Sequence, residues 1–186
     1  MKSEIQKCIE VLKSGGIILY PTDTVWGIGC DATNEDAVKK VFALKQRDDS
    51  KSLIILVAND AMLNNHVKNI PELAWDLIDL TDKPTTIIYD EAKNLAKNVI
   101  AQNGSTAIRM VKEGFCHQLV YNYRKPIVST SANMSDTATP LRFEEISPII
   151  KDGVDYIVNP KLAYGNKKPS SLIQLGMNGE VKVLRK

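Results

Sequence analysis

Apolar residues recur at helical spacing in several stretches of the chain. The first stretch is marked by Ile5, Cys8, Ile9 and Leu12, which would lie on one face of a helix. A Ser-x-x-Gln capping box beginning at Ser3 predicts where this helix starts. Similar spacing or helix-start residues predict four further helices: after Asn34, after Pro71, across residues 115–120 and from Ser147.

Short runs of apolar, β-branched or aromatic residues between these helices predict strands. The run at residues 52–57 is almost wholly apolar, which is typical of a strand buried on both faces. Pro21 follows another such run and is expected to end its strand, because proline cannot continue a central ladder. The remaining predicted strands are 17–20, 85–89, 105–110, 127–130, 156–158, 171–175 and 181–184.

The order of these elements indicates the fold class. Strands and helices alternate in the first part of the chain, and residues 176–179 (Gly-Met-Asn-Gly) predict a closing hairpin. This order is typical of an α/β fold with a twisted, mixed parallel and antiparallel sheet flanked by helices. The chain has no internal repeat and no linker-like segment, so we expect a single domain over residues 1–186.

Composition narrows the possible classes of protein. Of 186 residues, 44% are hydrophobic and 25% charged, which are ordinary values for a soluble globular chain. The net charge of +2 is too balanced to predict a nucleic-acid binder from charge alone. The N-terminus lacks the apolar core of a signal peptide, and no apolar run could span a membrane. Three cysteines without a C-x-x-C spacing then predict a cytoplasmic protein with reduced thiols.

Polar side chains gather where predicted strands end, and such edges are where α/β sheets tend to bind ligands. Thr22, Asp23 and Thr24 offer hydroxyls and a carboxylate directly after the first strand. Gly27 and Gly29 permit close approach of the backbone. The alternative is a polar turn in which Asp23 bonds local amides, and the spacing does not decide between the two.

Three further segments suit a polyanionic or polar ligand. Lys45, Arg47 and Lys51 could clamp a polyphosphate, although cations also favour the C-terminal end of any helix. Residues 129–133 (Ser-Thr-Ser-Ala-Asn) place three hydroxyls and an amide at a strand end, where a turn bonded to its own backbone is the alternative. Lys167-Lys168-Pro169-Ser170-Ser171 is a similar basic and polar loop before a strand.

Arg109 interrupts the apolar stretch at residues 107–110. A buried arginine is costly unless it is paired. We therefore expect Arg109 either to meet an internal carboxylate or to face a cleft, where it would hold a substrate carboxylate with two hydrogen bonds. The two histidines lie in no catalytic motif, and the chain has no Walker A sequence.

Together these segments resemble the motifs of the YrdC family of threonylcarbamoyl-adenylate synthases. The family's PTDTVYGLG is similar to residues 21–29, with Trp26 in place of tyrosine, and its KxR corresponds to Lys45 and Arg47. Its STSAN is intact at 129–133, and its arginine of RxP corresponds to Arg109. Its PST and ILR are similar to 169–171 and 183–185, so the match spans about 15–185. The family's WPGP(L/V)T is poorly kept at 81–86, and the proline of RxP is absent.

The resemblance implies a single YrdC-like domain with a concave ligand-binding face. It also implies a nucleotidyltransferase that joins L-threonine, bicarbonate or CO2, and ATP into threonylcarbamoyl-AMP, with release of pyrophosphate. The product serves the threonylcarbamoyladenosine (t6A) modification of tRNA. The resemblance further implies contact with tRNA, hand-off of the product to downstream modification proteins, and no role for a membrane. Mg²⁺ would arrive with ATP, with no metal held by protein side chains and no organic cofactor.

The resemblance also assigns roles to individual residues. Lys45 and Arg47 would be catalytic, neutralising the leaving pyrophosphate, and Trp26 would exclude water near the carbamoyl group. The threonine-binding residues would be Thr24, Arg109, Ser129 and Ser170. The ATP-binding residues would be Lys45, Arg47, Lys51, Ser105, Ser131, Asn133, Thr139 and Arg185.

A binding protein without catalysis is the alternative hypothesis. A concave basic surface could hold double-stranded RNA through phosphate contacts and act in RNA or ribosome maturation. The near-neutral charge balance and an aromatic content of 6% argue against it. Related carbamoyl-adenylate chemistry occurs in hydrogenase-maturation proteins with a YrdC-like domain, but those chains are much larger.

Overall fold

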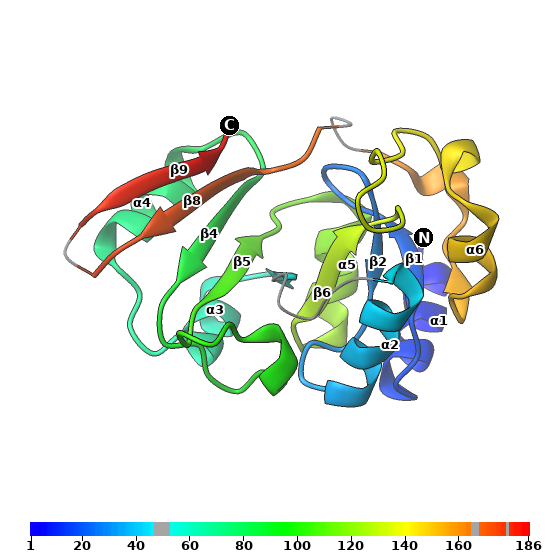
Figure 1. The fold of residues 1–186 in the computed structure, drawn as a ribbon, viewed down its shortest axis with the longest axis horizontal. Helices are drawn as coiled ribbons and strands as arrows, with labels where there is room; N and C mark the ends of the chain where they lie inside the picture. Colours follow the sequence, from blue (N-terminus) through cyan, green and yellow to red (C-terminus); the bar gives the residue numbers. More distant parts are fainter. Residues whose placement is uncertain (47–52, 165–167, 178) are drawn as a thin grey trace.

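The computed structural model describes residues 1–46, 53–164, 168–177 and 179–186. Its centre is a mixed sheet with the strand order β7-β1-β2-β6-β3-β5-β4-β8-β9 (Figure 1). The strands are β1 (Ile18–Pro21), β2 (Trp26–Gly29), β3 (Ile54–Val57), β4 (Thr85–Tyr89), β5 (Thr106–Met110), β6 (Ile127–Ser131), β7 (Tyr156–Ile157), β8 (Ser171–Leu175) and β9 (Val181–Arg185). β7–β1, β3–β5 and β4–β8 pair in parallel and the other neighbours antiparallel, which confirms the predicted mixed sheet.

Helices cover both faces of this sheet. Side chains on α1 (Lys2–Lys13) and α5 (Gly114–Tyr123) share one hydrophobic core with one face of the strands. The second core contains side chains of α2 (Glu35–Lys45), α3 (Asp60–His66), α4 (Glu72–Leu80) and α6 (Pro148–Asp152). Short 3-10 helices are η1 (Lys97–Val99), η2 (Phe143–Glu145) and η3 (Pro160–Leu162).

Strand β3 lies in the middle of the sheet and separates the two cores. Ile55 and Val57 point into the core of α2, and Leu56 points into the core of α1 and α5. All three side chains are fully buried, as predicted for this apolar run. No helix in the described part of the chain is both long and apolar enough to cross a bilayer.

The structure corrects several predicted element boundaries. The capping box at Ser3 is wrong, because α1 begins at Lys2 and its N-cap, Met1, makes no side-chain capping bond. The Asn34 cap is confirmed, since its side-chain oxygen accepts from the backbone N–H groups of Asp36 and Ala37 at 3.1 Å each. Pro21 is the last paired residue of β1, opposite Trp26 and beyond the two residues that pair with β7.

Strand β2 and helix α3 are the elements that the sequence did not predict. In β2, two glycines hide the strand pattern, because glycine has a low strand propensity. Gly29 is nevertheless needed there: an added Cβ would lie 2.7 Å from both the Tyr20 ring and the Val128 carbonyl oxygen. Helix α3 is short and mostly polar, so its sequence carries little periodic signal.

A polar cluster around Asp31 ties the end of β2 to the segment after α5. Its carboxylate accepts hydrogen bonds from the Thr33 hydroxyl at 2.6 Å, the Tyr123 hydroxyl at 2.7 Å and the Lys125 ammonium at 2.9 Å. Burial acts to raise the pKa of Asp31, but these hydrogen bonds outweigh burial and hold the pKa below its ordinary value. The ionised carboxylate is therefore part of the folded structure.

We predict that Asp31→Asn lowers the free energy of unfolding by about 2 kcal/mol at neutral pH, because it removes the charge and replaces the oxygen that accepts from Tyr123 and Lys125 by an NH2 group. Since the folded-state pKa is depressed, this stabilisation is present above the ordinary pKa of 3.8 and is lost as pH falls through the folded-state pKa. Urea unfolding at a series of pH values measures both effects. Asp36→Asn removes an exposed carboxylate paired with Lys39 and serves as the control, with an expected change below about 0.5 kcal/mol. Equal unfolding energies for the two variants would show that the hydrogen bonds of Asp31 do not stabilise the fold.

Candidate active site

A cavity of about 290 Å³ opens on the sheet face that carries α1 and α5. These two helices pack near β1, β3 and β7, in the half of the sheet that runs from β7 to β3. The cavity is lined by residues of β2, β6, β3, β5, β4 and β8, so it extends past the helices into the other half of the sheet. The turn between β1 and β2 and the segment before β8 complete the lining.

The predicted threonine-binding residues all line this cavity. They come from four separate segments: Thr24 from the β1–β2 turn, Arg109 from β5, Ser129 from β6 and Ser170 from the segment before β8. Strand register explains part of this convergence, since Ile54 of β3 pairs with both Ala107 and Ser129. The fold thus brings one guanidinium and three hydroxyls to one cavity.

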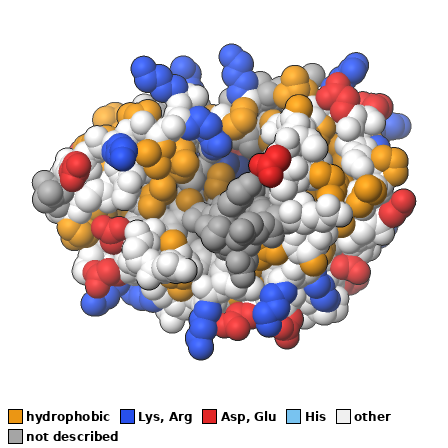
Figure 2. All heavy atoms as spheres, in the orientation of Figure 1, with side chains coloured by type: hydrophobic (Ala, Val, Ile, Leu, Met, Phe, Trp, Pro, Cys, Tyr) orange, Lys and Arg blue, Asp and Glu red, His pale blue; other side chains and the backbone are white. Residues whose placement is uncertain are grey.

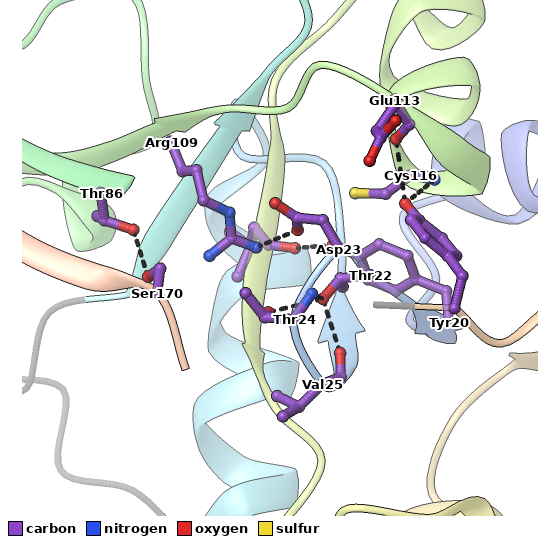
Figure 3. A network of polar contacts seen from close by, with 12 residues as sticks. Tyr20, Thr22, Asp23, Thr24, Val25, Thr86, Arg109, Glu113, Cys116 and Ser170 are labelled. Carbon is purple, nitrogen blue, oxygen red and sulfur yellow. Dashed lines mark hydrogen bonds and ion pairs between the residues drawn. The ribbon is translucent and has the colours of Figure 1, made fainter. Parts of the chain in front are cut away.

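Arg109 satisfies both alternatives that the sequence left open for it. Its side chain is 3% exposed, and its Nη2 donates to the Asp23 carboxylate at 3.0 Å (Figure 3). The same residue also lines the cavity. Its Nε is buried and has no hydrogen-bond partner among the described residues. A buried donor without a partner is costly, so local hydrogen bonds alone do not explain the position of Arg109.

The β1–β2 turn is closed by Thr22 instead of Asp23. The Thr22 hydroxyl donates to the Val25 carbonyl at 2.7 Å and lies 2.9 Å from the Thr24 hydroxyl (Figure 3). It also accepts from the Thr24 backbone N–H at 3.1 Å. The predicted polar turn is therefore present, but its local bonds are made by a hydroxyl. Asp23 is left available for Arg109, 86 positions away.

A second network surrounds Ser170 on the opposite wall. Its hydroxyl lies 2.7 Å from the Thr86 hydroxyl and 3.3 Å from Nη2 of Arg185. Arg185 also donates from Nε to the Ser170 carbonyl at 2.8 Å, which fixes the end of β9 to the segment before β8. Burial first, and then the positive charge of Arg109, lower the pKa of Arg185. Two guanidiniums therefore act on the same cavity, whose electrostatics favour an anion.

The predicted ATP-binding residues divide into groups. Ser131, Thr139 and Arg185 line the cavity. Lys45, Ser105 and Asn133 are not among the described lining residues. The predictions for Arg47 and Lys51 lie outside the residues that the structure describes.

Lys45 nevertheless contacts residues 129–133, here called the hydroxyl-rich turn, of which 129–131 form the end of β6. Its side chain is buried, and its ammonium donates to the carbonyls of Ser131 and Asn133, the latter at 2.7 Å. The Asn133 amide donates in turn to the Thr137 carbonyl at 2.6 Å. The end of α2 is thereby joined to the turn that presents Ser131 to the cavity.

Ser105 and Trp26 have local partners. The Ser105 hydroxyl donates to the Asn103 side chain at 2.8 Å, at the start of β5. Trp26 contributes to the cavity lining, while its ring packs against Phe143 with centroids 5.0 Å apart. Phe143 belongs to η2, which the sequence did not connect with this site.

A larger cavity of about 530 Å³ is also lined by Asp23. Its other walls include residues 81–85, where the chain departs from the family's WPGP motif, and Lys112, Glu113 and Tyr164. Charges of both signs meet there, so its lining does not favour one sign of ligand. Among the described residues, no group of three or more His, Cys, Asp or Glu side chains could hold a metal ion.

The sequence did not predict three contributors to the site: Thr22 as the closing group of the turn, Thr86 as a partner of Ser170, and Asp23 as the partner of Arg109. A signal existed for Asp23, because a buried arginine needs a carboxylate. Asp23 already stood out in the first polar segment, but the sequence contains 22 acidic residues and does not say which one comes near.

Comparisons with known proteins agree with this arrangement. The Threonylcarbamoyl-AMP synthase of Pseudoalteromonas translucida is 35% identical over 183 residues, which is 97% of this chain and 97% of that protein. The protein of the same name from Pseudomonas aeruginosa is 32% identical over 177 residues, covering 95% of this chain and 94% of that protein.

Solved structures show the same fold. A variant of P. abyssi Sua5 superposes with a TM-score of 0.87 at 25% identity, covering 97% of this chain and 55% of that one. P. abyssi Sua5 complexed with L-threonine gives a TM-score of 0.82 at 26% identity, covering 92% of this chain and 50% of that one. This chain thus corresponds to about half of the P. abyssi protein. The family model described as telomere recombination, Sua5_yciO_yrdC, matches residues 10–186, and the chain belongs to the Sua5/YciO/YrdC family.

Proposed function

We propose that this protein is a threonylcarbamoyl-AMP synthase, a nucleotidyltransferase acting on L-threonine, bicarbonate or CO2, and ATP. The observation that carries the proposal is the convergence of Arg109 with the hydroxyls of Thr24, Ser129 and Ser170 in one cavity. Relatives with this enzyme name match nearly the whole chain, and a structural relative was solved with L-threonine. In this proposal the 186 residues act as one catalytic domain.

The threonine side of the cavity supplies the chemistry that an amino acid needs. Arg109 has a guanidinium with five N–H donors and bonds Asp23 from Nη2 alone, so donors remain that suit the substrate carboxylate. The hydroxyls of Thr24, Ser129 and Ser170 can each donate or accept, so they suit the amine and hydroxyl of threonine. Two of the four residues, Arg109 and Ser129, lie within strands of the sheet, and such preorganisation would limit the cost of ordering them when the substrate binds.

The reaction that follows requires positioning more than a covalent nucleophile. The threonine amine attacks CO2 to give a carbamate, with loss of the amine proton. A carbamate oxygen then attacks the α-phosphate of ATP, and the bond to pyrophosphate breaks. In this scheme the protein orients the two substrates and neutralises the charge of the leaving pyrophosphate.

We assign the ATP side to the residues around the hydroxyl-rich turn. Ser131, Thr139 and Arg185 line the cavity next to the threonine residues, and Ser105 and Asn133 lie on neighbouring segments. Lys45 brings its charge to the base of the turn, and Arg47 with Lys51 would neutralise the pyrophosphate. Mg²⁺ would be carried by the nucleotide. In this proposal the enzyme acts in the cytoplasm, contacts tRNA and hands its product to proteins that complete t6A.

A double-stranded RNA-binding role has less support. Figure 2 shows Lys and Arg side chains along the upper edge of one face, with charges of both signs interspersed around the rest of that face. An RNA-binding surface of this kind would need a larger field of one sign. The buried Arg109 and the enclosed hydroxyls are also poorly placed for phosphates of a duplex.

The proposed reaction predicts pyrophosphate release that depends on threonine. Purified protein is mixed with ATP, Mg²⁺ and bicarbonate, and pyrophosphate is followed while single amino acids are supplied. We expect release with L-threonine and a formed product that contains threonine, the carbamoyl carbon and AMP. Pyrophosphate release that is the same with and without threonine, or salt-sensitive RNA retention without any release, would overturn the proposal.

Arg109→Lys keeps the positive charge but loses the planar fork that grips a carboxylate. We therefore predict that the KM for threonine rises at least about tenfold, with the KM for ATP nearly unchanged. Initial rates at varied concentrations of each substrate measure both constants. An unchanged KM for threonine would mean that the carboxylate binds elsewhere.

Arg47→Ala tests the leaving-group side. Because it removes charge that stabilises the departing pyrophosphate, we expect kcat to fall at least about 100-fold. Lys39→Ala is the matched control, since Lys39 is an exposed cation of α2 that pairs with Asp36. If both variants keep the wild-type kcat, Arg47 has no catalytic role.

A further inference from the structure

We propose that Asp23 is a positioning residue, which holds the Arg109 guanidinium in the orientation that receives the substrate carboxylate. This inference rests on the proposed function and adds a residue to which no role in threonine binding has been assigned above. It starts from the ion pair of 3.0 Å between Arg109 Nη2 and Asp23 Oδ1.

The β1–β2 turn does not need the Asp23 carboxylate for its own hydrogen bonds. Thr22 closes the turn through its hydroxyl, which bonds the Val25 carbonyl and the Thr24 backbone N–H. The Asp23 side chain points toward Arg109 of β5 (Figure 3). Its ion pair is therefore with a residue that lines the 290 Å³ cavity.

Asp23 also offsets the repulsion between the two guanidiniums that line the cavity. Arginine is long and has several rotatable bonds, so an unpaired guanidinium can adopt many positions. The charge of Arg185 also acts on the cavity and repels that of Arg109. Asp23 is the one carboxylate within ion-pair distance of Arg109 among the described residues. Without it, repulsion would move Arg109 away from the cavity wall.

The ion pair with Asp23 leaves Arg109 able to bind a substrate carboxylate. Asp23 accepts from one terminal nitrogen, while the buried Nε keeps no partner among the described residues. A guanidinium carries five N–H donors, so one carboxylate does not exhaust it. Asp23 thus fixes the side chain and leaves donors for a second carboxylate, that of the amino acid.

The test compares Asp23→Asn with Asp82→Asn in the full-length protein. Asp23→Asn removes the charge and keeps a carbonyl oxygen of the same size. Asp82→Asn removes an equal charge from an exposed residue that lines the same larger cavity as Asp23, while the ion pair of Arg109 is with Asp23. We expect the KM for threonine to rise about tenfold in Asp23→Asn and to stay within about twofold in Asp82→Asn. The KM for ATP should change in neither.

A structural role alone would produce a different result. Lower stability reduces the amount of active enzyme and so lowers the apparent kcat, but KM does not depend on enzyme amount. If Asp23→Asn is too unstable to purify, Asp23→Ser is measured in the same way. Because Asp23 is proposed to act through Arg109, adding Asp23→Asn to Arg109→Lys should raise the KM for threonine much less than it does in the wild type.

Each outcome supports or overturns the proposed role of Asp23. Wild-type activity with an unchanged KM for threonine in the Asp23 variant overturns this inference and leaves the synthase proposal standing. Fully additive effects of Asp23→Asn and Arg109→Lys also overturn it, because Asp23 would then act independently of Arg109. Absence of threonine-dependent activity in the wild-type protein instead overturns the proposed function.

Discussion

The site is built around a permanently charged guanidinium that is buried within a sheet, where an unpaired charge is costly. Arg109 occupies β5 between apolar neighbours, and its side chain is almost completely buried. Asp23 neutralises much of this charge from the β1–β2 turn, while Arg185 adds a second positive charge nearby. The two guanidiniums carry one more positive charge than the Asp23 carboxylate offsets, and they have N–H donors left for an anion. A substrate carboxylate supplies what the folded protein lacks, so binding energy is gained where the reaction needs orientation.

The rest of the fold keeps this cavity open and its walls rigid. Helices α1 and α5 cover only part of their sheet face, which leaves room over β5, β4 and β8. Lys45 fastens α2 to the hydroxyl-rich turn, and Arg185 fastens β9 to the segment before β8. These two contacts join elements that are distant in sequence.

Much of this architecture could be predicted from the sequence, because several elements have a strong local pattern of apolar or capping residues. The apolar β3, the β-branched β4 and the Asn34 cap were all predicted from local signals. The glycine-rich β2 and the polar α3 were not, since tertiary pairing stabilises them. The convergence of Thr24, Arg109, Ser129 and Ser170 came from the family resemblance, whereas the Asp23–Arg109 pair needed three-dimensional information. Its partners are 86 positions apart, and no local pattern links them.

The central claim is that the cavity recognises the carboxylate of an amino acid through Arg109. Calorimetric titration of the wild-type protein with L-threonine and with L-threoninol, which has a hydroxymethyl group in place of the carboxylate, tests it most directly. The account predicts that threoninol binds at least about 100-fold more weakly, because a buried guanidinium is left without its anion. Equal affinity for the two ligands would contradict it.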